Sequence, residues 1–384
     1  MKTEYITTKQ QLNEICTQFK DSNYLIIDTE FIRQTTYYPI LALLQVYDGK
    51  TIALIDPVAI DDLSPLFDIC FDPDIVKVLH SARQDMEIFY HICGKLPTPI
   101  FDTQIAAALL GHGSQIGYAA LTKAILGVEL DKSQTRTNWL KRPLTKKQLN
   151  YASNDVLYLE QIYKIQKQQL QEQQRLSWLE NDFNFLTEQE TYQVDKLNLW
   201  KKIRGFNRLK QDQLVVLQYL VAWREEIAIE KNITRKKVIH DDFLLEIAIQ
   251  KPKKNSDLSN FQCLSERLVQ HHGKTIINLV NQALDSPLQN WPTQPKRIQL
   301  TQQQDALADC LMAINHLCAD NNNISPNCLC NRKELEKLVL GKRSLGILSG
   351  WRFELAGKQL LSFLNGGNSL SVLHNQLSLQ HSTQ

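Results

Sequence analysis

The fold of the first half of the chain is decided by the stretch Tyr24-Leu25-Ile26-Ile27-Asp28-Thr29-Glu30, an apolar run that ends in two carboxylates. Strand side chains alternate between the faces of a sheet, so Asp28 and Glu30 point the same way. Two acids on one face repel each other, and a cation between them removes that conflict. The alternative is a loop that begins at Asp28, with both carboxylates solvated. Further carboxylates elsewhere in the chain decide between the two.

Short strands and helices alternate around this stretch. Asp48-Gly49-Lys50 predicts a tight turn that joins two strands into an antiparallel hairpin. Ser81, followed three residues later by Gln84, predicts a capping box at the start of a helix. Mixed strands and helices of this kind predict an α/β domain. The predicted strands are residues 22–28, 41–47, 51–55, 77–80 and 100–102, and a further predicted helix is 103–110.

Three more residues carry chemistry on predicted helices. Asp85 lies in the first turns of the helix after Ser81, where a negative charge can simply stabilise the helix start. A long helix is predicted from Thr145 by a capping box and a stripe of apolar residues. Tyr151 and Asp155 are four residues apart on that helix and share one face. Taken alone, this pair is better explained by a structural hydrogen bond between the tyrosine and the acid.

Composition bounds the class of protein. The chain has 384 residues with 43% hydrophobic and 22% charged residues, which predicts two or three globular domains. No run approaches the ~18 apolar residues of a membrane span, and no signal peptide is recognised, so we expect no membrane and a cytoplasmic location. The eight cysteines are scattered. Cys328 and Cys330 lie close together, but the second pair of ligands that a zinc site would require is missing. We therefore interpret the cysteines as reduced thiols, and the sequence assigns no function to Cys328 and Cys330.

Charge is distributed unevenly along the chain. Residues 1–195 carry 18 Lys or Arg against 25 Asp or Glu, whereas residues 196–299 carry 18 against 10. An acidic first half suits metal ligands, and a basic middle suits a polyanion such as RNA. The alternative is that the uneven charge is a chance result of which solvent-exposed faces carry charged residues.

Helices are predicted in the second half of the chain. The apolar spacing from residue 211 onward is helical, a proline-rich linker spans residues 286–295, and helices are predicted again from Gln302. The last ten residues are expected to lack regular structure.

Several motifs together resemble the DEDD exonuclease superfamily in its tyrosine-containing branch, and within it the bacterial ribonuclease D family. The signature positions of that branch are matched by Asp28, Glu30, Asp85, Tyr151 and Asp155. The segment after residue 211 resembles an HRDC domain, whose usual role is nucleic-acid contact. The family motifs are DTEFIR at 28–33, TYYP at 36–39, LLQ at 43–45, HSARQD at 80–85 and NWLKRPL at 138–144.

The resemblance implies a ribonuclease H-like α/β exonuclease domain followed by two all-α, HRDC-like helical bundles. We expect these at residues 1–195, 205–290 and 296–375. It also implies a 3′–5′ exoribonuclease that trims structured RNA, with transfer RNA precursors as the expected substrate, and we expect a monomer. The alternatives are a 3′–5′ DNA exonuclease, since metal chemistry ignores the sugar, and an RNA-binding protein that has lost catalysis.

Site roles follow from the same resemblance. Asp28, Glu30, Asp85 and Asp155 would hold two divalent cations, Mg²⁺ or Mn²⁺, for which carboxylate oxygens are suitable ligands. Tyr151 would orient the attacking water. A phenol with a pKa near ~10 stays protonated at neutral pH, so it can position a water molecule by a hydrogen bond but is a poor base. The predicted RNA contacts are Trp139, Lys141 and Arg142 beside the active site and Arg235, Lys236 and Lys237 in the basic middle. For Trp139 a place in the core is an equally good interpretation.

Overall fold

The computed structural model describes residues 2–258, 261, 266–294 and 299–381. Its contacts divide these into two compact units. The first unit comprises residues 1–31, 41–191 and 298–384, and the second comprises 32–40 and 192–297. The C-terminal residues therefore group with the N-terminal domain rather than with the basic middle segment that precedes them in sequence.

A six-stranded mixed sheet is the centre of the first unit, in the order β1-β4-β3-β2-β5-β6. The predicted hairpin is confirmed, since β3 and β4 pair antiparallel and Gly49 turns between them at φ +89°. β5 pairs parallel with both β2 and β6. The strands are β1 (Lys2–Ile6), β2 (Tyr24–Ile32), β3 (Ile40–Tyr47), β4 (Thr51–Ile55), β5 (Val76–Leu79) and β6 (Ile100–Asp102).

Two corrections concern the sheet. The loop alternative at Asp28 is wrong, because β2 continues through both carboxylates to Ile32. The sequence analysis also missed β1, which pairs parallel with β4 from Lys2 to Ile6. This strand reads KTEYI and carries only a weak apolar alternation, so its position depends on its partner β4.

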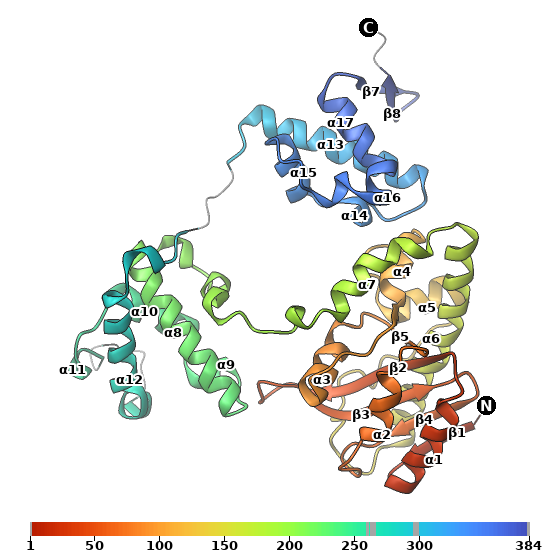
Figure 1. The fold of residues 1–384 in the computed structure, drawn as a ribbon, viewed down its shortest axis with the longest axis horizontal. Helices are drawn as coiled ribbons and strands as arrows, with labels where there is room; N and C mark the ends of the chain where they lie inside the picture. The colour runs from red at the N-terminus through yellow and green to blue at the C-terminus, as the bar shows by residue number, and fades with distance from the viewer. Residues whose placement is uncertain (1, 259–260, 262–265, 295–298, 382–384) are drawn as a thin grey trace. The chain divides into compact units, whose positions relative to one another are not determined.

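Helices cover the two faces of this sheet, as Figure 1 shows for α3 in front and α6 behind. The predicted capping box at Thr145 and Gln148 is present at the start of α6, a helix of 27 residues. Apolar side chains of α6, such as Leu159 and Tyr163, share a core with Ile26 of β2. The helices are α1 (Lys9–Phe19), α2 (Ser64–Cys70), α3 (Arg83–Cys93), α4 (Thr103–Leu109), α5 (Tyr118–Leu126), α6 (Lys146–Glu172) and α7 (Glu180–Thr187).

The start of α3 differs from the prediction. Ser81 makes no capping box, because its backbone is left-handed at φ +58° and the helix begins at Arg83. Asp102, at the end of β6, caps the turn instead. Its carboxylate accepts the backbone N–H of Ser81 at 3.0 Å and of Ala82 at 2.8 Å, and it also caps α4 through Gln104. One buried acid thus fixes the helix that carries Asp85.

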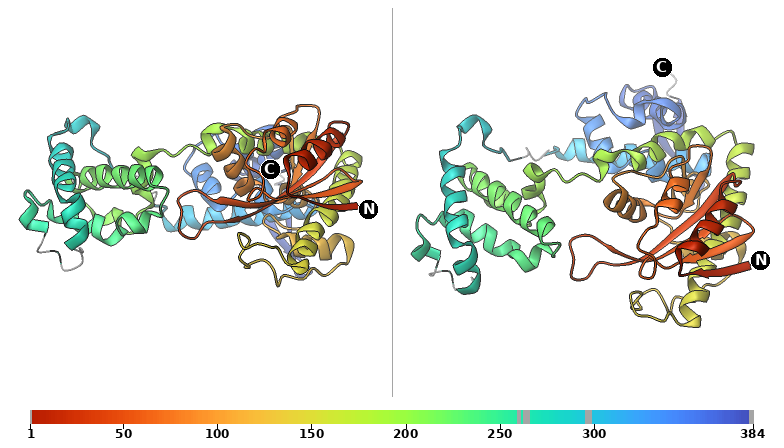
Figure 2. Two further views of the ribbon diagram at one scale, coloured as in Figure 1. Left: turned by 90° about the horizontal axis from the view of Figure 1, so that it is seen from below. Right: turned by 60° about the horizontal axis from the view of Figure 1, so that its bottom comes forward.

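The second unit is a helical bundle that also contains the connection between β2 and β3. Figure 2 shows this connection, residues 33–39, as a loop without helix or strand. Its Tyr37 is 5% exposed and belongs to the core of the bundle. Within this unit, the backbone N–H groups of Tyr37 and Tyr38 both donate to the side-chain oxygen of Asn232, at 3.1 and 3.0 Å. The main helices are α8 (Gln211–Glu230), α9 (Arg235–Val238), α10 (Asp241–Gln250), α11 (Asn255–Leu258) and α12 (Glu266–Asp285).

The predicted linker at residues 286–295 begins as a short 3₁₀ turn, and Trp291 packs against the core of the second unit. Pro295 lies outside the described residues. The C-terminal region then forms a small helical bundle with its own core. Its elements are α13 (Gln302–Asn321), α14 (Pro326–Leu329), α15 (Arg332–Val339), α16 (Gly350–Arg352), α17 (Lys358–Leu364), β7 (Asn368–Leu373) and β8 (Gln376–His381).

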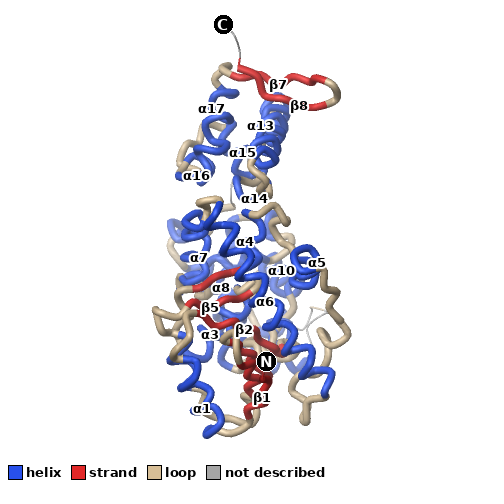
Figure 3. Tube along the Cα trace, turned by 90° about the vertical axis from the view of Figure 1, so that its right-hand side faces the viewer, coloured by secondary structure: helices blue, strands red, loops and turns tan. Residues whose placement is uncertain are grey.

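Two expectations for this C-terminal region are wrong. It is not wholly helical, and most of the last ten residues are ordered, because β7 and β8 pair as a hairpin, drawn as two red strands in Figure 3. The turn consists of His374 and Asn375, at φ +50° and +61°. Two successive left-handed residues make the tight turn that suits paired strands, and Asn tolerates that conformation. The absence of glycine from the turn concealed it.

The C-terminal bundle is held to the exonuclease domain by stacked aromatic rings. Trp178 and Trp351 lie parallel, 4.6 Å between centroids and 6° between planes. The Arg175 guanidinium lies 5.2 Å from the centroid of the Trp178 ring, and that of Arg352 lies 4.4 Å from the centroid of the Trp351 ring. Cation–π contacts of this kind add to the stacking. The bundle therefore packs as part of the first unit.

Among the described helices, none combines the length and the hydropathy that crossing a bilayer requires.

Candidate active site

Alternation along β2 decides which side chains meet. Ile26 contributes to the core shared with α6, so Asp28 and Glu30, two and four residues further on, face the same side. The hydroxyl of Tyr24 donates to Glu160 of α6 at 2.7 Å, which fastens the strand to the helix. One helical turn and a residue before Glu160 lies Asp155. The register of β2 against α6 thus brings carboxylates from both elements together.

Asp28, Glu30 and Asp155 form one cluster. Each offers a carboxylate oxygen, and these three oxygens all lie within 4.8 Å of one another. Asp155 is 8% exposed, and the other two are half-buried. Carboxylate oxygens this close are the donor set that a hard divalent cation requires. The cluster fits a divalent metal ion of the kind that the family resemblance implies.

Asp85 lies outside that group of three. Its carboxylate is oriented by Thr29, a residue on the other face of β2. The hydroxyl of Thr29 donates to the Asp85 carboxylate in a short hydrogen bond, and both residues are less than 9% exposed. Thr29 stands between the two acids of the strand and therefore points away from them. Sequence reasoning missed this residue, although the alternation that pairs Asp28 with Glu30 already directs Thr29 toward α3.

The electrostatics of the cluster favour a cation. Burial, together with the charges of Asp28, Asp155 and Asp85, raises the pKa of Glu30 to about 10. Burial likewise raises the pKa of Asp28 to about 6. Burial and the neighbouring Asp28 also raise the pKa values of Asp85 and Asp155 well above the usual range. Without a bound cation, these acids repel one another too strongly for all of them to be ionised. They therefore bind either protons or a divalent cation, which removes the repulsion.

Tyr151 lies on α6, one turn before Asp155, and is half-buried. Burial and the charge of Asp155 raise the pKa of its phenol, so the hydroxyl stays protonated at neutral pH. The Thr135 hydroxyl lies 3.5 Å from it. A neutral phenol beside a carboxylate cluster can donate or accept a hydrogen bond but is a poor base.

Tyr118 is a further residue that the sequence analysis missed. Its hydroxyl donates to the backbone carbonyl of Asp155 at 2.6 Å and to that of Asn154 at 3.0 Å. It therefore holds the segment of α6 that presents Asp155. His80 makes local contacts, with Thr103 at 2.9 Å and the carbonyl of Ile116 at 3.1 Å, which supports a structural rather than a metal-binding role.

Two of the predicted RNA contacts near the active site have structural roles here. Trp139 is 1% exposed, so its ring offers no face to a base, and it packs against Tyr151 with 6.0 Å between ring centroids. Arg142 makes two hydrogen bonds of 2.6 Å to the carboxylate of Asp56. Of this group, Lys141 alone is exposed. The sequence suggested RNA contacts because an aromatic ring lies next to two cations. In the structure, Trp139 and Arg142 contact residues that are distant in sequence.

The basic triplet of the second unit is divided in the same way. Arg235 pairs with Glu225, which is fully buried, through hydrogen bonds of 2.5 and 2.6 Å. Lys237 donates to the backbone carbonyl of Thr35 at 3.4 Å. Lys236 is exposed, with no ion pair among the residues that the structure describes. Arg235 therefore has a structural partner although its side chain is 43% exposed, and Arg235, Lys236 and Lys237 stay predicted RNA contacts.

A mixed sheet with carboxylates gathered from strand β2 and a covering helix is an arrangement that suits a metal-dependent nuclease. The family model described as 3′–5′ exonuclease matches residues 3–171, and the model of the HRDC domain matches residues 213–280. Ribonuclease D proteins are up to 39% identical to this chain over more than nine-tenths of its length, so the chain belongs to the ribonuclease D family. It is a 3′–5′ exoribonuclease, a hydrolase whose class depends on divalent metal ions and acts on RNA.

Named relatives establish this membership over almost the whole chain. Ribonuclease D of Bartonella henselae is 39% identical over 365 residues, which cover 94% of this chain and 90% of that protein. Ribonuclease D of a Shewanella species is 36% identical over 364 residues, with 93% of each covered. The crystal structure of Escherichia coli RNase D matches with a TM-score of 0.83 at 32% identity, over 95% of this chain and 99% of that one. This match confirms the predicted fold class of the exonuclease and HRDC regions.

Proposed function

We propose that the protein trims the 3′ ends of structured RNA, with transfer RNA precursors as its main substrates, by a two-metal mechanism that releases nucleoside 5′-monophosphates. The observation that carries the mechanism is the convergence of Asp28, Glu30 and Asp155 within 4.8 Å. Structured RNA is supported by the similar Escherichia coli enzyme, which is described as an exoribonuclease involved in structured RNA processing. The cytoplasmic location, the monomeric state and the domain bounds stay predictions.

The residues have distinct roles in this proposal. Asp28 would touch both cations, Glu30 and Asp155 the cation on the side of the attacking water, and Asp85 the cation on the side of the leaving group. Bound there, two divalent cations would supply a polarised water and stabilise the departing 3′ oxygen. Thr29 orients Asp85 through its hydrogen bond. These carboxylates also confine the scissile phosphate to one place, because they repel it wherever no cation intervenes.

Tyr151 orients the attacking water in this proposal. Because its pKa is raised by burial and by Asp155, the phenol keeps its proton and fixes the water by a hydrogen bond. Trp139 packs against the Tyr151 ring and limits its rotation. Trp139 is thus a positioning residue for catalysis.

Tyr151→Phe is expected to lower the single-turnover rate of nucleotide release by roughly 10- to 100-fold, because only the water-orienting hydroxyl is lost. RNA affinity should stay within twofold of the wild-type value. Tyr158→Phe removes a hydroxyl from the same helix and should leave the rate unchanged. An unchanged rate in Tyr151→Phe would mean that this tyrosine only packs.

The substrate is tested with a transfer RNA that carries a few extra nucleotides at its 3′ end. We expect the purified enzyme to remove the extension faster than it degrades the mature transfer RNA, because the paired acceptor stem cannot thread single nucleotides into the carboxylate cluster. The controls are an unstructured RNA of equal length and the DNA version of each strand. Equal rates on extended and mature transfer RNA would contradict the proposed substrate, and equal rates on RNA and DNA would favour a nuclease without sugar selectivity.

A further inference from the structure

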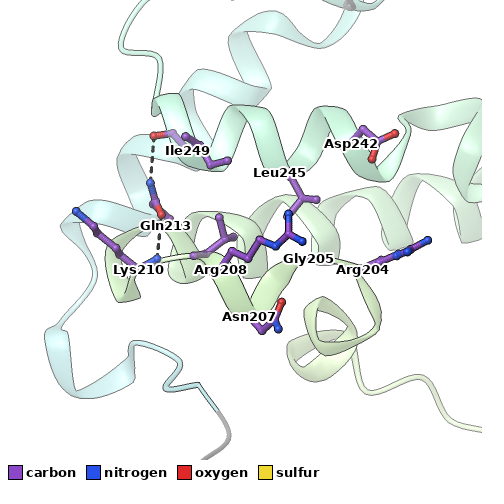
Figure 4. Close-up of a pocket in the computed structure, with 10 residues that line it drawn as sticks. Arg204, Gly205, Asn207, Arg208, Lys210, Gln213, Asp242, Leu245 and Ile249 are labelled. Atoms are coloured by element: carbon purple, nitrogen blue, oxygen red, sulfur yellow. Dashed lines mark hydrogen bonds between the residues drawn. The ribbon is translucent and has the colours of Figure 1, made fainter. Parts of the chain in front are cut away.

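A basic pocket lies in the second unit, remote in sequence from the residues that the family motifs identify. It is formed by the turn at residues 204–210, the start of α8 and one side of α10 (Figure 4). Its volume is about 960 Å³. Arg204, Arg208 and Lys210 line it from the turn, and all three are exposed. Leu245 and Ile249 of α10 form its apolar wall, and Ile249 is 51% exposed.

No ion pair joins Arg204, Arg208 or Lys210 to a carboxylate in the described part of the chain, so the positive charge of the pocket is not neutralised by an ion pair. One acid, Asp242, also lines the pocket, so its lining carries three positive charges against one negative. Four other cations of the unit are neutralised by nearby carboxylates. The ion pairs there are Lys196–Glu226, Arg224–Asp241, Arg235–Glu225 and Lys251–Asp212.

The backbone of the turn is fixed so that its carbonyl groups are already bonded. The side-chain amide of Gln294 donates to the carbonyl of Asn207 at 3.1 Å and to that of Leu209 at 2.6 Å. Gly205 has φ +99°, a conformation that favours glycine, and it lets the chain reverse beside Leu245. Carbonyls bonded to Gln294 are less able to repel an anion. The amino end of the 20-residue helix α8, where the Gln213 side chain accepts the backbone N–H of Lys210 at 2.9 Å, adds partial positive charge.

We propose that this pocket binds two successive phosphates of the RNA substrate, with Leu245 and Ile249 against the ribose or base between them. The cations neutralise phosphodiesters, and an exposed apolar wall beside them suits a nucleotide better than a free inorganic anion. This inference rests on the proposed function and deepens it, because it places an RNA-binding site of the second unit at the turn at residues 204–210 rather than at Arg235.

The test is RNA affinity as a function of salt for the full chain. Arg204→Ala with Arg208→Ala removes two charges from the pocket, and Lys231→Ala with Lys274→Ala removes two exposed charges from the same unit but outside the pocket. Each phosphate contact contributes ~0.7 to the salt slope for a single strand, so the pocket variant should lower the slope by roughly 1.4. Its affinity should fall at least ~10-fold at low salt. The matched control loses only the long-range field and should keep its slope.

A third variant separates charge from packing. Arg204→Lys with Arg208→Lys keeps both charges and should restore most of the slope. Equal slopes in the pocket variant and the matched control would overturn the proposal, as would a loss that lysine does not restore. Inorganic phosphate that competes as well as a dinucleotide would overturn the role of the apolar wall. The proposed function is scored separately, on nucleotide release by the wild-type enzyme, so the failure of one is distinguishable from the failure of the other.

Discussion

Asp28→Asn is expected to abolish nucleotide release while the protein stays folded. The substitution keeps the shape of the side chain and removes one charge from the three-carboxylate cluster. Because metal-bound oxygens stabilise several kcal/mol of transition-state charge, we expect turnover to fall by at least roughly 10³-fold at saturating Mg²⁺. Burial raises the pKa of Asp28 to about 6, so the wild-type carboxylate is costly to charge without a cation.

The same variant should respond differently to metal in a thermal unfolding experiment. Mg²⁺ or Mn²⁺ binds the folded cluster and should raise the melting temperature of the wild-type protein, and this increase should largely vanish in Asp28→Asn. Asp68→Asn removes an exposed charge from α2 and serves as the control for both readouts. Near-normal turnover in Asp28→Asn would contradict the assignment of this residue.

The second large effect is on stability. Arg235→Ala leaves the carboxylate of Glu225, which is fully buried, without its charged partner. Breaking a buried pair costs roughly 3–5 kcal/mol, and because the Arg235 side chain is 43% exposed we expect the loss to be smaller, about 2–3 kcal/mol. The hydrogen bond from the Tyr37 hydroxyl to Glu225 remains in the variant. Calorimetric unfolding of the full chain measures the effect, and Lys236→Ala should leave the melting temperature unchanged.

This loss should depend on pH. Burial raises the pKa of Glu225, but the hydrogen bonds from Arg235 and Tyr37 outweigh it and hold the pKa below its usual value. A carboxylate with a lowered pKa contributes stability that is present above its unfolded pKa, ~4.3, and is lost as the pH falls through its folded pKa. The gap between wild type and Arg235→Ala should therefore be complete at pH 6 and narrow below pH ~4. A gap that is constant with pH would show that Arg235 contributes packing alone.

Local patterns predicted the catalytic elements well, for a physical reason. Asp28 and Glu30 share a face because strands alternate, and Tyr151 and Asp155 share a face because helices repeat every 3.6 residues. Both rules act within a few residues, so sequence alone carries them. The start of α6 was likewise predicted, since Thr145 and Gln148 cap it reciprocally within one turn.

What sequence alone could not predict are contacts between residues that lie far apart in sequence. Asp102 replaces the expected capping box at Ser81 from 21 positions away, and Arg142 is occupied by Asp56, 86 positions away. Tyr37 meets Glu225 across 188 positions. No local spacing encodes such contacts, because an arginine on the surface and one that pairs with a buried acid have the same neighbours in sequence. The predicted RNA contacts depended on that distinction.

The most direct test of the account uses an RNA labelled at its 5′ end, with an unpaired 3′ tail, incubated with the wild-type enzyme. The carboxylate cluster predicts a ladder of products that shorten from the 3′ end and release of nucleoside 5′-monophosphates with Mg²⁺ or Mn²⁺, and no reaction in EDTA. Products that form equally in EDTA, or that shorten from the 5′ end, would contradict it.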